Sequence, residues 1–180
     1  MSSTTSSEQS VATLSASKLH ELAIESFRIG NRGRLSLCDE LRVLADTRLF
    51  HDLGHPSITA HAEAHFQLRR SETLESIRVA RALQQLTRIR EAFAEGRLGW
   101  SVVKAITRVA SEQTEELWLR FAAEHTLEQT LAEVRDARRN SRDRPREDRF
   151  GLPNLDERWV LRFSRSEMEK IRLGCERLIE

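Results

Sequence analysis

The sequence has few residues that interrupt helices and few that build disulfide or metal frameworks. Its 180 residues include only three prolines, seven glycines and two cysteines, whereas Leu, Ala, Arg and Glu are common. Cys38 and Cys175 are far apart and match no metal-binding or redox spacing, so we interpret them as reduced thiols. No apolar run approaches the roughly 18 residues that a membrane span needs, and we expect no membrane partner. Because unbranched side chains and alanine lose little freedom in helices, the composition favours an all-α protein.

Motifs of secretion and of catalysis are also missing. Residues 1–10 have neither the basic start nor the apolar run of a secretion signal, so we expect a cytoplasmic protein. The sequence contains no Gly-rich phosphate loop, no GxSxG elbow and no CxxC pair, and neither cysteine has a histidine close by in sequence. We therefore expect no catalytic residue and no cofactor in this chain.

Positive charge is concentrated in two segments. The whole chain carries 29 Lys and Arg against 28 Asp and Glu, a net charge of +1 that argues against a general polyanion binder. However, residues 69–90 hold six Arg against two Glu, and residues 135–149 hold seven Arg against four acids. This pattern predicts one face that meets phosphates while the remainder stays neutral. The second segment fits equally well a solvated linker whose charges pair with one another.

Periodicity and cap residues divide the chain into segments. We interpret residues 1–13 as a disordered tail, 14–140 as a helical domain, 141–157 as a charged linker, and 158–180 as a short strand and a capped helix, truncated at the chain end. In the helical domain, the glycines at 30 and 33 predict a turn between two helices. The Gly-His-Pro sequence at 54–56 predicts another break, after which Ser57 caps a helix that ends near Phe66.

The following helices are placed by the same signals. Ser71 is the expected N-cap of a helix whose buried face carries Leu74, Ile77, Ala80 and Leu83. Further helices are predicted over residues 89–95 and 102–109, from Ser111 onward, and over 127–134 behind a Thr126 cap. The fold class is therefore all-α: a multi-helix domain that includes a helix-turn-helix-like pair, a short extended segment and a terminal helix.

The segment from Leu53 to Leu83 has the proportions of a helix-turn-helix unit, in which the second helix presents its N-terminal face to the major groove. Two glutamates, Glu72 and Glu75, oppose phosphate binding on that face, and an ordinary helical hairpin with solvated arginines is the alternative. The residues predicted to contact DNA are Arg69, Arg70, Ser71, Thr73, Ser76, Arg78, Arg81 and Arg88.

Four histidines form two pairs at i,i+4 spacing, His51 with His55 and His61 with His65. This spacing places both rings of a pair on one helical face, where they could hold a metal ion. The Gly-Pro break disrupts the first pair, and the second does not match the zinc-protease motif. We interpret these histidines as polar surface residues and predict no metal site.

Three phrases follow one another at fixed spacing in the centre of the chain: RVARAL at 78–83, AFAEGRL at 92–98 and WSVVKAITRVA at 100–110. In this order they resemble the helical domain of unknown function, of the 13E12-repeat type, that precedes HNH endonuclease modules. The similarity extends from about Leu53 to the C-terminus. A shorter stretch, residues 92–108, resembles the helix-turn-helix domain of ParB-type partition proteins.

The resemblance implies a DNA-binding or DNA-positioning accessory domain of an HNH-type endonuclease, with duplex DNA as the partner. The nuclease module itself is missing, because nothing after Phe163 supplies its paired His and Asn residues. The alternative from another class is a helical module for a protein partner or for self-association. Exposure of Trp100 and Trp118 would favour that alternative.

Overall fold

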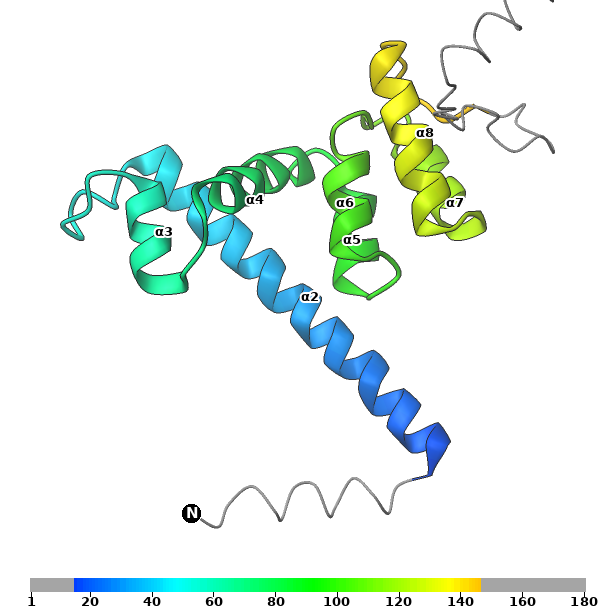
Figure 1. The fold of residues 1–180 in the computed structure, drawn as a ribbon, viewed down its shortest axis with the longest axis horizontal. Helices are drawn as coiled ribbons and strands as arrows, with labels where there is room; N and C mark the ends of the chain where they lie inside the picture. The colour runs from blue at the N-terminus through cyan, green and yellow to red at the C-terminus, as the bar shows by residue number, and fades with distance from the viewer. Residues whose placement is uncertain (1–14, 147–180) are drawn as a thin grey trace, which may run out of the picture. The chain divides into compact units, whose positions relative to one another are not determined.

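The structure, a computed structural model, describes residues 15–146, and this part of the chain is built from helices without a strand (Figure 1). The all-α class is therefore confirmed. The predicted tail, most of the charged linker, the short strand and the terminal helix lie outside the described residues. The elements are α2 (Ala16–Thr47), α3 (Ile58–Phe66), α4 (Arg70–Leu83), α5 (Thr87–Ala94), α6 (Trp100–Ile106), α7 (Glu115–Glu124) and α8 (Leu127–Arg139).

The prediction of a turn at residues 30–33 is wrong, because α2 continues through them for 32 residues in all. Gly30 and Gly33 lie on its exposed surface. Asn31 between them is buried, and its amide donates to the carbonyls of Phe93 and Leu98, at 2.9 and 3.1 Å. The asparagine that suggested a turn therefore fixes a continuous helix to the end of α5 and to the connection that follows it.

A three-residue connection, 67–69, joins α3 to α4. Ser57 caps α3 as predicted, since its hydroxyl accepts the backbone N–H of Ala60. The cap of α4 differs from the prediction: Arg69 occupies the N-cap, and its backbone N–H donates to the carboxylate of Glu72. Ser71 consequently lies within the first turn of α4 and does not cap it.

The buried face of α4 contains Ile77, Ala80 and Leu83 as predicted, but it also contains two polar residues in place of Leu74. Its buried stripe begins with Thr73, Ser76, Ile77 and Ala80, whereas Leu74 is 46% exposed. These four positions follow the i, i+3, i+4, i+7 spacing of one helical face. The packing of α4 against α2 covers that face, so two polar residues occupy places that the sequence pattern assigns to solvent.

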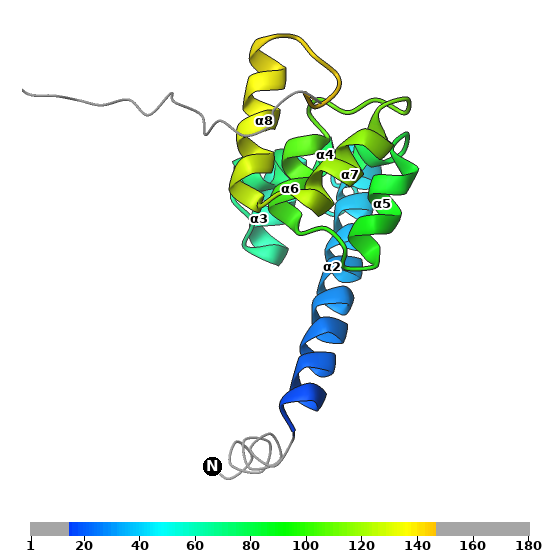
Figure 2. The ribbon, with the colours of Figure 1, turned by 90° about the vertical axis from the view of Figure 1, so that its right-hand side faces the viewer.

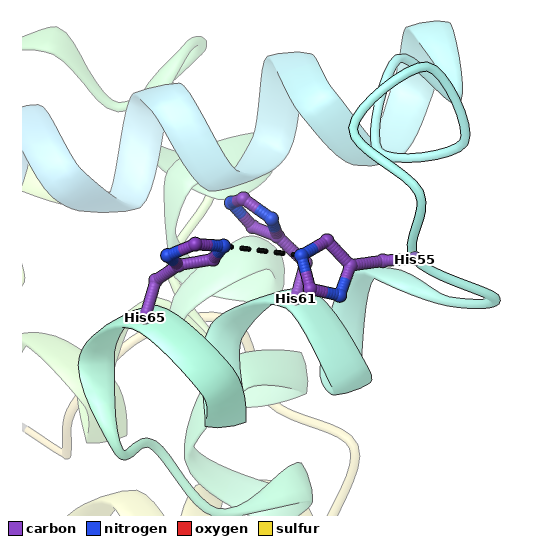
Figure 3. Close-up of side chains that lie close together, drawn as sticks. All are labelled: His55, His61 and His65. Carbon is purple, nitrogen blue, oxygen red and sulfur yellow. Dashed lines mark hydrogen bonds between the residues drawn. The ribbon is translucent and has the colours of Figure 1, made fainter.

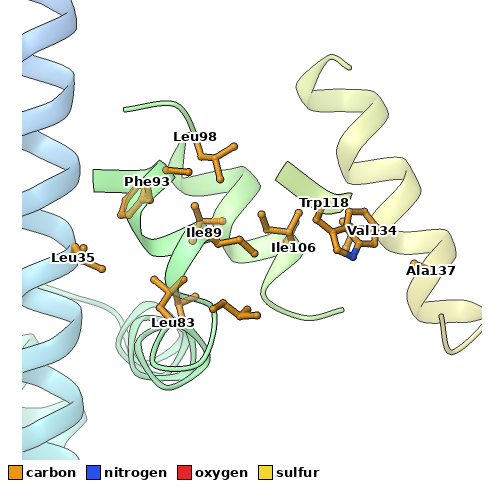
Figure 4. Packing of buried hydrophobic residues seen from close by; sticks show 14 residues of the cluster. Leu35, Leu83, Ile89, Phe93, Leu98, Ile106, Trp118, Val134 and Ala137 are labelled. Atoms are coloured by element: carbon orange, nitrogen blue, oxygen red, sulfur yellow. The ribbon is translucent and has the colours of Figure 1, made fainter. Parts of the chain in front are cut away.

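Two hydrophobic clusters hold the helices together, and α4 contributes to both. The smaller cluster joins Leu41 of α2, Ala62 of α3 and Ile77 of α4. The larger one extends from Leu83 at the end of α4 through the helices that follow (Figure 4). Trp118 lies fully buried within this cluster, and α8 packs beside α6 (Figure 2).

The later helices occur in the predicted order with shifted ends. α5 begins two residues before Ile89, and α6 begins at Trp100 instead of residue 102. α7 begins at Glu115 because residues 111–114 form a turn in which the Thr114 hydroxyl accepts the backbone N–H of Ser111. Thr126 caps α8 as predicted, with Gln129 completing the reciprocal pair. None of the helices between residues 15 and 146 is both long enough and apolar enough to cross a membrane.

Candidate nucleic-acid interface

Thr73 and Ser76, two of the residues predicted to face DNA, are buried. Thr73 is fully buried, and its hydroxyl donates to the carbonyl of Arg69. Ser76 is 5% exposed and lies beside Cys38 of α2. Burial raises the pKa of the Cys38 thiol, and a hydrogen bond with Ser76 partly offsets that rise. The expectation that both residues are exposed is wrong, because α4 uses this face to pack against α2.

Three of the five predicted arginines have carboxylate partners within the protein. Arg78 pairs with Glu75, and its guanidinium also donates to the carbonyl oxygens of Lys104 and Thr107. Arg81 pairs with Asp46 at 2.5 Å, and Arg88 pairs with Glu116 at 2.7 Å. Arg78 therefore holds α4 to α6, while Arg81 and Arg88 are exposed with part of their charge neutralised.

Arg69, Arg70 and Ser71 remain accessible at the start of α4. Neither Arg69 nor Arg70 has an ion-pair partner for its guanidinium among residues 15–146. Ser71 lines the edge of a groove described next. Of the eight residues predicted from the sequence, these three are exposed and without a carboxylate partner, and the nearly fully buried Ser76 also lines that groove.

A groove of about 780 Å³ lies between the beginning of α4, α6 and α8, and Arg34 of α2 contributes to it. Five basic residues line the groove against two acidic ones, Glu72 and Glu75. We call it the basic groove. Its basic residues are Arg34, Lys104, Arg108, Arg135 and Arg138.

Four of these five cations have no carboxylate partner in the described part of the chain. Arg108 is the exception, since it donates to both oxygens of Glu75. Arg135 donates to the Leu131 carbonyl one turn earlier in α8, and the guanidinium of Arg34 lies 4.6 Å from the centre of the Trp100 ring. The groove therefore has an excess of positive charge that residues 15–146 do not neutralise.

Glu75, one of the two acids that line the groove, pairs with Arg78 and Arg108. Burial raises its pKa, but hydrogen bonds and charge attraction from Arg78 and Arg108 outweigh this effect and lower the pKa below its usual value. Glu75 consequently stays ionised at neutral pH, where it positions two arginines. Its negative charge is shared between them and opposes phosphate less than an unpaired carboxylate would.

The two tryptophans of the described chain differ in accessibility. Trp118 is fully buried, and its ring N–H donates to the carbonyl of Asp143 at 2.8 Å, so it cannot dock a partner. Trp100 is half-buried and forms part of the groove wall. Its ring holds the guanidinium of Arg34 at the groove wall through the cation–π contact.

Sequence analysis did not identify most of the residues that line the basic groove. Arg34, Lys104 and Arg108 lie in segments where acids equal or outnumber bases, so charge counting along the chain does not find them. Arg135 and Arg138 belong to the Arg-rich run that was noted at 135–149. Farther along that run, Arg142 and Arg146 pair with Glu133 and Asp136 of α8, which supports internal pairing for that part.

Comparison with known proteins gave no match: no protein-family model, no curated protein and no solved structure is similar to this chain.

Proposed function

We propose that this chain is a DNA-binding module that holds duplex DNA through the basic groove. The observation that carries the proposal is the set of four groove cations, Arg34, Lys104, Arg135 and Arg138, which lack carboxylate partners in residues 15–146. Arg69 and Arg70 extend this positive surface at the start of α4, next to Ser71.

The positive charges of the groove are better suited to contacts with DNA phosphates than to recognition of base edges. Lys and Arg contacts to phosphates position a protein on the duplex, whereas sequence is read by side chains that reach base edges. Thr73 and Ser76 were the neutral hydrogen-bonding residues expected on a reading face, and both are buried. The proposed contact is therefore one of positioning, with Ser71 as the remaining polar candidate for a base or sugar contact.

Positioning is also the role that the resemblance to HNH-associated domains implies. In this proposal the chain brings DNA to a nuclease module that the 180 residues do not contain. In this proposal the accessory domain binds DNA in a fixed position without strong sequence preference, because the nuclease module carries out the cleavage.

The test is binding of a labelled DNA duplex, followed by fluorescence anisotropy at low salt. The variant R135Q/R138Q removes two exposed cations from one face of α8. The matched control, R81Q/R88Q, removes two exposed arginines that pair with Asp46 and Glu116 and do not line the groove. We expect the groove variant to weaken binding about tenfold or more, because each lost phosphate contact also loses its counterion release. The control should weaken it much less.

Two results would contradict the proposal. One is the absence of salt-dependent binding to duplex DNA at micromolar protein. The other is an equal loss of affinity in both double variants, which would place the contact outside the groove or make it a general charge effect. Circular dichroism of each variant verifies that all four substitutions leave the helices intact.

Self-association is a second candidate, favoured by the N-terminal half of α2. All residues from Ala16 to Gly30 are exposed, and among them Leu22, Phe27 and Ile29 are 46%, 48% and 59% exposed. These exposed apolar side chains are the observation that favours an interaction surface on this part of α2. Sedimentation equilibrium of the full chain distinguishes the candidates, since a monomer across the micromolar range excludes self-association through this surface.

A further inference from the structure

Three histidines come together at α3, although the sequence suggested two separate pairs. His61 and His65 lie one turn apart on α3, and His55 lies two residues before the Ser57 cap (Figure 3). One ring nitrogen from each lies within 4.8 Å of the others, and the Nε2 atoms of His55 and His65 are 3.0 Å apart. His51 is not part of this cluster, since its ring packs against Phe50.

His61, the buried member of the cluster, has a polar atom without a partner. His61 is 6% exposed, and its Nδ1 is buried with no hydrogen-bond partner in residues 15–146. Buried polar atoms of this kind are uncommon because each costs roughly 1–3 kcal/mol of desolvation. Burial, together with the nearby rings of His65 and His55, lowers the pKa of His61.

We propose that His55, His61 and His65 bind one divalent transition-metal ion, for which Zn²⁺ is the best fit. Two ligands of a tetrahedral zinc ion at Zn–N distances of about 2.0–2.1 Å lie roughly 3.3 Å apart, close to the separation of the His55 and His65 nitrogens. An all-imidazole ligand set suits Zn²⁺, Cu²⁺ and Ni²⁺, whereas Mg²⁺ and Ca²⁺ require oxygen ligands.

The proposed ion would keep one coordination position open and would link two parts of the chain. Three protein ligands leave the fourth tetrahedral position for water or another small ligand, and the exposure of His65 gives solvent access to it. The ion would also tie the segment before Ser57 to α3. None of the three histidines lines the basic groove, so this site is independent of the proposed DNA binding.

The test is isothermal titration of the metal-free full chain with ZnCl₂, repeated with H65A, H55A and the control variant H51A. The parent and H51A should bind one equivalent with micromolar affinity or tighter. H65A and H55A should each lose at least about tenfold in affinity, in line with the effect of disturbing a metal site. Cobalt(II) gives a second readout, because four-coordinate Co²⁺ bound by the parent should show visible absorption that H65A lacks.

Specific results would overturn the site. They are the absence of saturable zinc binding, an affinity unchanged by H65A and H55A, or an equal loss of affinity in H51A. His65 and His55 are the substitutions of choice because neither is buried, unlike His61. Circular dichroism of the metal-free variants shows whether the fold is retained, and H65A alone suffices if H55A unfolds.

Discussion

Asn31 links α2 to the end of α5 and to the connection between α5 and α6 through a single buried amide. It donates to two carbonyls more than 60 residues away in sequence, those of Phe93 and Leu98. We expect N31A to lower the free energy of unfolding by about 2 kcal/mol, since both carbonyls lose their donor in a buried place. Urea denaturation of the parent and the variant measures this change.

Asn140 provides the matched control for this substitution. Its amide also donates to a backbone carbonyl, that of Asp136, but at an exposed position and within the same turn. N140A should therefore change the free energy of unfolding much less than N31A. Equal effects of the two substitutions would show that the buried linkage contributes little.

Buried polar residues such as Asn31 account for much of what could not be predicted from the sequence. Asn31 in a Gly-Asn-Arg-Gly context predicts a turn by local rules, and the partners that override them are remote in sequence. Thr73 and Ser76 are likewise assigned to solvent by their polarity, whereas their burial depends on where α2 crosses α4. Isolated polar residues on a buried helical face cannot be located from periodicity alone.

At the scale of elements, α2 is the largest departure from the prediction, and its glycines offer a direct test. Gly30 and Gly33 lie within the helix, and a methyl group added at either would meet no atom within 4 Å. G30A and G33A should each raise the free energy of unfolding by about 0.5–1 kcal/mol, because glycine costs conformational entropy in a helix. Chemical denaturation measures the gain.

Gly96 is the contrasting position in the turn between α5 and α6. Its φ is +77°, and an added Cβ would lie 2.9 Å from Cγ of Arg28. G96A should therefore destabilise the protein. A loss of stability in G30A and G33A as well would mean that residues 30–33 form a turn and that α2 is broken there.

Cap residues predict two of the helix starts in this chain, whereas Arg69 and not the predicted Ser71 caps α4. Ser57 and Thr126 locate the starts of α3 and α8 correctly, because each side chain satisfies a backbone N–H of its own helix. Such bonds are local, so the sequence contains the information that they need. In α4 the periodicity places Ile77, Ala80 and Leu83 correctly on the buried face, and only Leu74 of the predicted stripe is exposed.

At the scale of the whole molecule, the basic groove depends on the assembly of four helices. Arg34 comes from α2, Lys104 from α6 and Arg138 from α8, and more than 100 residues separate the first from the last. The charge counts of residues 69–90 and 135–149 identify the start of α4 and the end of α8 as positive. These two helix ends border the groove. The groove itself could not be predicted, because it requires the packing of α8 against α6.

The net charge of the whole chain, +1, makes salt dependence an informative measurement of the proposed DNA contact. A nearly neutral protein has little general attraction for DNA, so counterion release reports on local contacts. With Arg34, Lys104, Arg135 and Arg138 each meeting one phosphate, the slope of log K against log salt concentration should be about −3.6. R135Q/R138Q should reduce the magnitude of that slope by about 1.8, which anisotropy titrations across a salt series measure.

R81Q/R88Q changes net charge by the same amount and provides the comparison. Its slope should equal that of the parent, because Arg81 and Arg88 already pair with Asp46 and Glu116 away from the groove. A slope that falls equally in both variants would trace the salt effect to total charge. A slope that falls in the groove variant alone assigns the released counterions to phosphates held by α8, which charge counting over the whole chain could not reveal.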